Sequence, residues 1–303
     1  MPSPPNPPST PHPPVIRQGD VCTHLADLHK HHRFDVIIAD PPYNIGKDFG
    51  NDSDSRELTA YIDWTKHWLD LCYQLLTPTG LIYVYGYAEI LAHIAVHYPL
   101  HQQRWLTWHY TNKTTPASRF WQRSQETILC LWRAPRRPAL EIDQIREPYT
   151  DHYLKCADKP RKDTPCRFNG NKARATTYRA HPRGALPRDV LKIPALAGGA
   201  GLKERWFLCH DCGNKVFPPS ALKDHRGHKI MKHPTQKPMQ LTQKLIRSRI
   251  NGSGGRVLIP FAGSGSECVV AQSLNIPFVA IELNPVYVNF ANQWLAQMRA
   301  HNV

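Results

Sequence analysis

Short apolar runs and amphipathic stretches alternate along most of this chain. The apolar runs contain β-branched or aromatic residues and end at turn-forming residues, which is typical of buried strands. Between the runs, apolar residues recur at helical spacing, as they do from Tyr61 to Leu75. Strands that alternate with helices predict an α/β fold with a doubly wound, Rossmann-like parallel sheet.

The predicted elements form two groups, separated by residues 134–232, where the alternation is lost. The first group has strands at 15–19, 34–40, 81–84, 103–110 and 126–132, and helices at 59–76 and 88–97. We expect Pro78 and Gly80 to end the helix at 59–76. The second group has an amphipathic helix within 233–250, strands at 256–261 and 277–282, and helices at 267–274 and 285–299.

The chain therefore divides into four predicted parts. Residues 1–14 hold eight of the 28 prolines and predict a disordered tail. Residues 15–133 and 233–303 are the two α/β segments, and an irregular segment at 134–232 lies between them. The polar segment at 44–58 predicts a mobile loop beside the end of a strand.

The apolar run at 34–39 ends in Asp40, Pro41, Pro42 and Tyr43. Proline donates no backbone hydrogen bond, so the strand must stop at the edge where open α/β sheets bind ligands. The amino group of a nucleobase is a poor nucleophile, and two acceptors that hold its hydrogens localise its lone pair. The Asp40 carboxylate and the Pro41 carbonyl offer two acceptors, and Tyr43 offers a ring face for a flipped base. The alternative is a strand followed by an ordinary Asp-Pro turn.

A glycine turn joins a predicted strand to a helix near the end of the chain. Its sequence is Phe-Ala-Gly-Ser-Gly at 261–265, which lets a ligand approach the backbone. Glu282 ends the next strand about twenty residues later, where an acid can hold a ribose diol. Asp20 ends the first predicted strand, and it either contacts a cofactor or caps a helix at 21–30.

The charge of the chain points to a polyanionic partner. The formal net charge is +14 and the pI is about 9.5. Residues 134–232 hold 21 Lys and Arg against 10 Asp and Glu, a net charge of +11, which predicts a nucleic-acid-facing region. Aromatic residues in this region either stack on bases or pack in a core; they are Phe168, Tyr178, Trp206 and Phe207.

The location expected from the sequence is the cytoplasm. Eight cysteines, mostly scattered, fit a reducing compartment better than a disulfide framework. The chain has no run of 18 apolar residues and no signal-peptide pattern, so no membrane association is expected.

Four residues within 205–230 have spacing similar to that of a C2H2 zinc finger: Cys209, Cys212, His225 and His228. Phe217 and Leu222 lie between the two pairs, where a small core is expected. The gap between the histidines is one residue shorter than usual, and His233 is a possible substitute ligand. The alternative is two loop cysteines in a His-rich chain.

The order of these motifs resembles that of S-adenosylmethionine-dependent DNA amino-methyltransferases of the beta arrangement. In that family an Asp-Pro-Pro-Tyr half precedes a target-recognition region, a His-Pro-Thr-x-Lys-Pro segment and a Phe-x-Gly-x-Gly half. All four occur here in that order, over about residues 15–299. The resemblance implies a circularly permuted motif order, with a catalytic half at 15–133, target recognition at 134–232 and a cofactor-binding half at 233–303. The insertion at 205–230 departs from the family pattern and is expected to widen DNA contact.

The resemblance also implies a role for each motif residue. It makes Asp40, Pro41, Pro42 and Tyr43 catalytic. Glu282 would bind the ribose of the cofactor, Asp20 its adenine side, and Thr235 and Lys237 its carboxylate. The implied cofactor-binding residues are Asp20, Asp40, His233, Thr235, Lys237, Phe261, Ala262, Gly263, Ser264, Gly265, Glu282 and Asn284.

Asp-Pro-Pro-Tyr favours adenine as the target, since cytosine amino-methyltransferases more often carry Ser first; cytosine remains the alternative. A cytosine ring-carbon methyltransferase needs a Pro-Cys nucleophile, and Pro165-Cys166 lies off any predicted strand. A protein-glutamine methyltransferase would carry Asn at position 40. A DNA-binding protein without activity, and an RNA substrate, are further alternatives. Duplex DNA is the expected partner, with or without a cognate restriction nuclease, and the chain is expected to be a monomer or homodimer.

Overall fold

The structure is a computed structural model. It describes residues 15–29, 32–47, 54–112, 117–161, 176–177, 179–197, 199, 203–252 and 254–300. The predicted tail at 1–14, Phe168 and Tyr178 lie outside the described residues. The chain divides into two compact units, one of residues 1–140 with 189–303 and one of residues 141–188.

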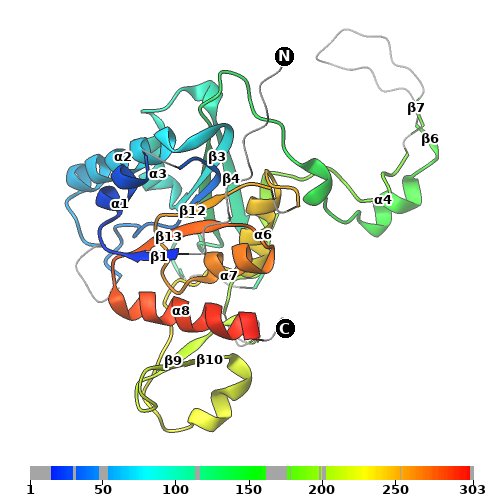
Figure 1. Cartoon of the computed structure of the whole chain (residues 1–303). Helices are drawn as coiled ribbons and strands as arrows, with labels where there is room; N and C mark the ends of the chain where they lie inside the picture. Colours follow the sequence, from blue (N-terminus) through cyan, green and yellow to red (C-terminus); the bar gives the residue numbers. More distant parts are fainter. Residues whose placement is uncertain are drawn as a thin grey trace, which may run out of the picture. The chain divides into compact units, whose positions relative to one another are not determined.

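A β-sheet forms the centre of the larger unit (Figure 1). It has eight strands, in the order β1-β13-β12-β2-β3-β5-β4-β8. Neighbouring strands are parallel from β1 to β3, whereas β5 is antiparallel to both β3 and β4. The strands are β1 (Val15–Gln18), β2 (Phe34–Ala39), β3 (Leu76–Gly86), β4 (Gln103–His109), β5 (Gln125–Leu131), β8 (Val190–Lys192), β12 (Val257–Ile259) and β13 (Phe278–Glu282).

The predicted purely parallel sheet is therefore a mixed one. β4 and β5 are antiparallel neighbours joined by residues 110–124, among whose described residues there is no helix. A parallel connection would need a crossover of a dozen or more residues, usually helical. The strand predicted at 81–84 is also longer, because β3 begins at Leu76 and its pairing with β2 shifts register before Leu81.

Helices cover both faces of this sheet, as the doubly wound prediction requires. Residues of β2 alternate between two apolar clusters, with Val36 and Ile38 in one and Ile37 and Ala39 in the other. The helices on the Ile37 side are α1 (Val21–Leu28), α2 (Leu58–Gln74) and α3 (Ala88–Ala95). Those on the Val36 side are α6 (Met239–Arg247), α7 (Ser266–Ser273) and α8 (Pro285–Ala300). A 3-10 turn, η1 (Leu100–Gln102), precedes β4.

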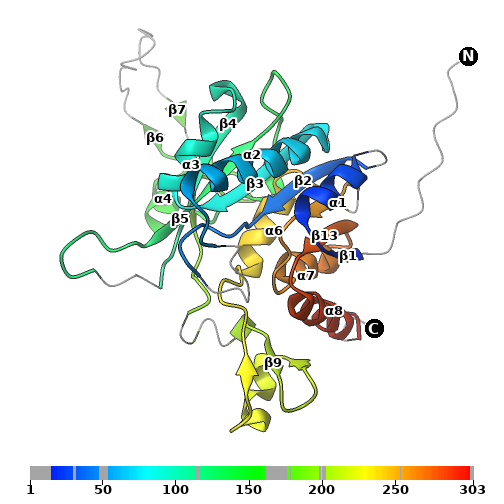
Figure 2. The ribbon, with the colours of Figure 1, turned by 90° about the vertical axis from the view of Figure 1, so that its left-hand side faces the viewer.

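A small lobe belongs to the larger unit and lies beside α8 (Figures 1 and 2). Its sheet has the order β10-β9-β11, and its 3-10 helix is η3. Gln293 and Gln297 on α8 hydrogen-bond to the backbone of Asn214 and Val216. The elements of the lobe are β9 (Phe207–Cys209), β10 (Lys215–Phe217), η3 (Pro219–His225) and β11 (Ile230–Met231).

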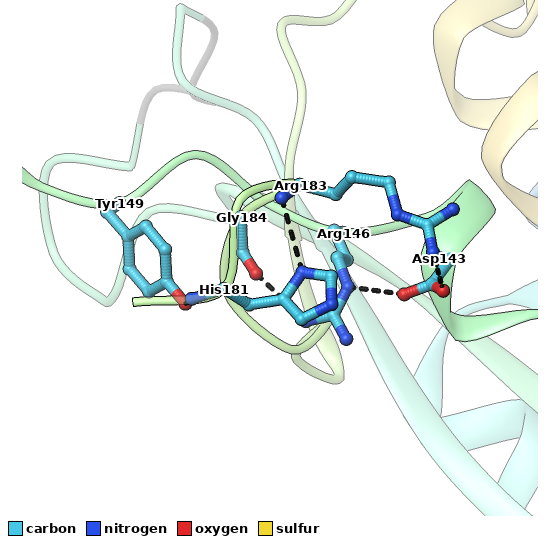
Figure 3. A network of polar contacts seen from close by, with 6 residues as sticks. All are labelled: Asp143, Arg146, Tyr149, His181, Arg183 and Gly184. Carbon is cyan, nitrogen blue, oxygen red and sulfur yellow. Dashed lines mark hydrogen bonds and ion pairs between the residues drawn. The ribbon is translucent and has the colours of Figure 1, made fainter. Parts of the chain in front are cut away.

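The smaller unit, residues 141–188, has short elements held by polar contacts. Asp143 pairs with Arg146 at 2.6 Å and with Arg183, and the Arg146 guanidinium also donates to the Gly184 carbonyl (Figure 3). Arg188 pairs with Glu147 at 2.8 Å. The elements are η2 (Ile142–Gln144), α4 (Asp151–Cys156), β6 (Pro160–Arg161) and β7 (Thr176–Thr177).

The unit boundaries differ from the boundaries at 134 and 232 that the composition predicts. β8 pairs with β4 in the central sheet, and the lobe packs on α8, so residues 189–232 belong to the larger unit. Apolar residues hold this part in place: Trp206 is buried and stacks on Trp294 of α8, and Phe207 is buried in the lobe. Trp206 and Phe207 therefore pack in apolar cores, which was the alternative to stacking on bases. Among the described helices, none is long and apolar enough to cross a membrane.

Candidate active site and metal cluster

The carboxyl ends of β1, β2, β12 and β13 converge on one pocket. Parallel strands end at the same edge of a sheet, so residues that follow different strands meet there. Asp20 follows β1, Asp40 follows β2, Phe261 follows β12 and Glu282 ends β13. Of the predicted site residues, those that line the pocket are Asp20, Asp40, Pro41, Pro42, Tyr43, His233, Thr235, Lys237, Phe261, Ala262, Gly263, Ser264 and Glu282.

Lys237 is the centre of a buried charge network in this pocket. Its Nζ lies 2.8 Å from Oδ1 of Asp40 and 3.5 Å from Oε2 of Glu126, which is on β5. The rings of Tyr43, Tyr85 and Trp108 lie 5.3, 5.0 and 6.0 Å from the same Nζ. Two carboxylates balance the charge of a lysine that is only 3% exposed, and cation–π contacts with three aromatic rings stabilise it further.

This pairing sets the ionisation of the three charged groups. Burial alone would lower the pKa of Lys237, but Asp40 and Glu126 raise it above its ordinary value. Burial opposes ionisation of Glu126, yet Lys237 and the hydroxyls of Tyr110 and Tyr43 outweigh burial and lower its pKa. Burial raises the pKa of Asp40, Lys237 opposes this rise and Glu126 adds to it. Asp40 is thus the more basic of the two carboxylates.

The hydroxyl of Tyr43 is part of the same network. It lies 2.8 Å from Asp40 Oδ1 and 2.8 Å from Glu126 Oε2, while Tyr110 donates to Glu126 Oε1 at 2.5 Å. Tyr87 packs edge-on against the Tyr43 ring at 5.4 Å. The sequence predicted a role for the ring of Tyr43 and did not predict a role for its hydroxyl.

Two acceptors at the strand end remain without partners among the described residues. Tyr43 and Lys237 both contact Oδ1 of Asp40, so Oδ2 has no hydrogen-bond partner among the described residues. The carbonyl of Pro42 accepts from the Tyr61 hydroxyl at 2.7 Å, whereas no described residue donates to the carbonyl of Pro41. These are the two oxygens that the sequence predicted as acceptors for an amino group.

The glycine turn after β12 is held by Glu282. Oε2 of Glu282 accepts from the Gly263 amide and Oε1 from the Asn284 amide, both at 2.8 Å. Burial raises the pKa of Glu282, and these amides oppose the rise. Asn284 is not among the residues that line the pocket, and its side-chain oxygen accepts from the Val286 amide at the start of α8.

The two glycines of this turn meet different neighbours. Gly263 has φ +51°, and a Cβ there would lie 2.8 Å from the His233 ring. Gly265 has φ +86°, and a Cβ there would lie 2.5 Å from Cβ of Ala291 on α8. Gly265 does not line the pocket. The lack of a side chain at this position allows the close approach of α7 to α8.

The segment His233–Lys237 ends in a residue, Lys237, that contacts Asp40 directly. Lys237 lines the pocket and pairs with Asp40 and Glu126, contacts that the sequence did not predict. His233 packs on Tyr287 at 4.6 Å, and burial lowers its pKa to about 3, so its ring is neutral. His233 lies in the pocket and is not part of the Cys/His cluster described below.

Several site residues were not predicted from the sequence. Glu126 lies within an apolar strand and is the one acidic residue of β5, a signal that could have marked it. Trp64 packs against the apolar cluster on the Ile37 side of the sheet and also lines the pocket, where its ring lies 5.8 Å from that of Phe261. The 44–58 loop is organised by the buried Asp54, whose carboxylate accepts from the amides of residues 44, 45 and 47. Asp20 both caps α1, through the Thr23 amide at 3.0 Å, and lines the pocket.

The lobe brings together the four predicted metal ligands. The ligand atoms of Cys209, Cys212, His225 and His228 lie within 4.8 Å of one another. Nδ1 of His228 is 3.3 Å from Cys209 Sγ and 3.4 Å from Cys212 Sγ, and Nδ1 of His225 is 3.7 Å from Cys212 Sγ. Phe217 and Leu222 pack in the core of the lobe, as predicted. The histidines differ from those of a C2H2 finger because His225 ends a 3-10 helix rather than lying on an α-helix.

Comparisons with known proteins identify the family of this chain. Residues 34–293 match the family described as DNA methylase. The chain is 27% identical over 268 residues to the type II methyltransferase M.HpaI of Haemophilus parainfluenzae, covering 86% of this chain and 68% of that protein. It is 25% identical over 278 residues to the DNA adenine methyltransferase YhdJ of Escherichia coli (strain K12), covering 90% of this chain and 80% of that protein.

Two solved structures share the fold. The M1.HpyAVI–SAM complex has 17% identity and a TM-score of 0.52, over 92% of this chain and 98% of that one. The PvuII DNA methyltransferase (cytosine-N4-specific) has 14% identity and a TM-score of 0.57, over 95% of this chain and 91% of that one. Because the family match spans most of the chain, this protein belongs to the DNA methylase family and is an S-adenosylmethionine-dependent DNA methyltransferase.

Proposed function

We propose that this protein methylates the exocyclic amino group of an adenine flipped out of duplex DNA. The observation that carries the proposal is the pair of acceptors after β2, Asp40 Oδ2 and the Pro41 carbonyl, which have no partner among the described residues. An amino group has two hydrogens, and these oxygens would hold one each. Lys237 and Tyr43 hold Asp40 through its other oxygen.

Bound S-adenosylmethionine would supply the methyl group from its sulfonium and leave as a neutral thioether, while Asp40 and the Pro41 carbonyl hold the amino nitrogen that takes the methyl group. The nitrogen must then lose one proton. Asp40 is the acceptor for this proton, since its pKa lies above that of an ordinary aspartate. This chemistry requires no covalent intermediate with the protein and no cysteine.

The pocket fits a cofactor that carries positive charge and a ribose. Asp40, Glu267 and Glu282 all line it, and burial raises the pKa of each carboxyl group. In the proposal Glu282 binds the ribose, Asp20 the adenine side and Thr235 the carboxylate. Lys237 has a different role from the one the family resemblance implies: it holds Asp40 in place. The order of these motifs along the chain corresponds to the beta arrangement.

The aspartate at position 40 favours adenine over cytosine as the target base, because cytosine amino-methyltransferases more often carry Ser at the corresponding position. The relatives support either base: one is called a DNA adenine methyltransferase and a fold neighbour is called cytosine-N4-specific. Methylated duplex DNA should be digested to nucleosides and separated by mass. Deoxyadenosine methylated on its amino group is expected. Deoxycytidine methylated on its amino group would overturn adenine as the target, and deoxycytidine methylated on a ring carbon would overturn the mechanism as well.

We further propose that Cys209, Cys212, His225 and His228 hold a structural zinc ion. Tetrahedral Zn²⁺ with bonds of about 2.3 Å to sulfur and about 2.0 Å to nitrogen places these atoms roughly 3.5 Å apart. The three sulfur–nitrogen distances of 3.3, 3.4 and 3.7 Å agree with that value. Such a set of four protein ligands leaves no open position, so the ion would have no part in methyl transfer.

Duplex DNA would contact the basic region, residues 134–232, in this proposal. Part of its positive charge is already used, since Arg146, Arg183 and Arg188 pair with Asp143 and Glu147. The type II names of the relatives support a partner nuclease of the same recognition site. DNA methylated by the protein would then resist that nuclease, which a digestion assay measures.

A further inference from the structure

Glu267 is a buried carboxylate in the pocket to which none of the sequence motifs assigns a role. It lies in the first turn of α7 directly after the glycine turn and lines the pocket. An acid in the first turn of a helix is common, but it normally reaches solvent. Glu267 is only 4% exposed.

One oxygen of Glu267 lacks a partner. Oε2 accepts from the Ser266 hydroxyl at 2.8 Å, whereas Oε1 is buried and has no hydrogen-bond partner among the described residues. A buried carboxylate oxygen without a partner costs free energy, and it persists where a ligand satisfies it.

Glu267 forms no ion pair with a described cationic side chain. Asp40 is near enough to raise the pKa of Glu267, and Lys237 lowers it. Lys237, however, already forms ion pairs with Asp40 and Glu126. Tyr85 and Cys268 also interact with Glu267. His233 in the same pocket is neutral, and Lys47 and Arg56, which also line the pocket, are exposed.

We propose that Glu267 binds the α-ammonium group of the methionine part of S-adenosylmethionine. The ammonium is a compact cation with three hydrogens, and it would satisfy Oε1 of Glu267 in a site from which water is largely excluded. Glu267 then serves one end of the cofactor while Glu282, across the glycine turn, serves the ribose. This inference rests on the proposed function, because it assumes that the pocket holds this cofactor.

Cofactor binding then depends on pH through Glu267. Burial and then Asp40 raise the pKa of Glu267 to about 7, and a bound cation lowers that pKa. Below pH 7, Glu267 must release a proton when the cofactor binds, so affinity falls as the pH falls; above pH 7 it is already ionised and affinity is level. Replacement by Gln removes this part of the pH dependence.

The test measures the affinity of two ligands by calorimetry on the whole protein without DNA. Both ligands contain a neutral thioether in place of the sulfonium of the cofactor. S-adenosylhomocysteine has the α-ammonium, and 5′-methylthioadenosine lacks the amino-acid part. Glu267→Gln should weaken binding of S-adenosylhomocysteine tenfold or more at pH 8 and leave that of 5′-methylthioadenosine within twofold. The wild type should lose affinity for S-adenosylhomocysteine between pH 7.5 and 5.5 more steeply than the variant.

Each other outcome overturns the inference. Equal loss for both ligands would mean that Glu267 shapes the pocket as a whole, and no loss for either would mean that it has no part in binding. Thermal unfolding of the ligand-free variant within 2 °C of wild type shows that the pocket is intact. If wild type binds neither ligand, the proposed function fails together with the inference; if it binds both and only the Gln variant behaves unexpectedly, the inference alone fails.

Discussion

At the scale of single residues, Lys237 determines what the other charged groups can do. It is buried between Asp40 and Glu126, so removing either acid leaves a lysine with one partner, and removing Lys237 leaves two carboxylates close together. The three residues come from three distant parts of the sequence. A substitution at any of them therefore changes both the charge and the geometry of the reacting end of the pocket.

Asp40→Asn keeps the size of the side chain and removes its charge. We expect the rate of methyl transfer to fall by roughly 100-fold or more, because the amide can neither take the proton nor hold the charge of Lys237. Transfer of labelled methyl groups to duplex DNA measures the rate, and DNA binding measured by anisotropy should stay near that of wild type. Turnover within tenfold of wild type would exclude Asp40 as the proton acceptor.

Tyr43→Phe separates the hydroxyl from the ring. The hydroxyl donates to Asp40 and so stabilises the ionised carboxylate; without it, the pKa of Asp40 rises further. Because Asp40 acts in its ionised form, the acidic limb of the pH profile of kcat/KM should move to higher pH, with activity at alkaline pH largely kept. Tyr43→Ala should lose activity at every pH. A Phe variant with an unchanged profile would show that the hydroxyl does not tune Asp40.

At the scale of elements, the turn between β12 and α7 is limited by packing as well as by ligand access. Gly265 lies against Ala291, so the position of α8 depends on a residue that sequence motifs assign to the cofactor. The spacing of the motifs predicted the strand, the turn and the helix correctly. It could not predict this contact, because nothing in the local sequence indicates which later helix lies across the turn.

Gly265→Ala should destabilise the protein by about 1–3 kcal/mol, since the new methyl group overlaps Ala291 and the residue has a positive φ. Ala291→Gly in the same chain should restore part of that loss by removing the overlapping methyl group, while the strain at positive φ stays. Urea unfolding of the two single variants and the double variant gives the coupling free energy. Strictly additive effects would contradict the packing explanation.

The lobe on α8 is a second element whose stability should depend on one interaction. Protein purified without added zinc should contain about one zinc per chain, and Cys209→Ser with Cys212→Ser should remove it and lower the melting temperature by roughly 5 °C or more. Cys156→Ser is the matched control, because Cys156 is a partly exposed free cysteine outside the lobe. Metal-free protein that unfolds at the wild-type temperature would contradict a structural zinc ion.

At the scale of the whole molecule, local patterns predicted the elements better than their arrangement. The catalytic motif and the glycine turn lie where the sequence placed them, at the carboxyl ends of parallel strands, because the apolar runs before them are unambiguous. The antiparallel β5, the pairing of Lys237 with Glu126, and the packing of the lobe on α8 all depend on contacts between distant segments. Periodicity carries no information about such contacts, and these are the points at which the structure differs from expectation.

The uneven charge along the chain leads to a prediction about DNA binding. If residues 134–232 supply the phosphate contacts, the logarithm of the binding constant should fall linearly with the logarithm of salt concentration, by about 0.9 per phosphate contact. Lys155 and Lys159 form no ion pair among the described residues, so Lys155→Ala with Lys159→Ala should reduce this slope by up to about 2. Arg146→Ala with Arg188→Ala is the matched control, since both arginines already pair with acids of their own unit and should change the slope less. A slope that is the same in both double variants and in wild type would place the phosphate contacts elsewhere on the protein.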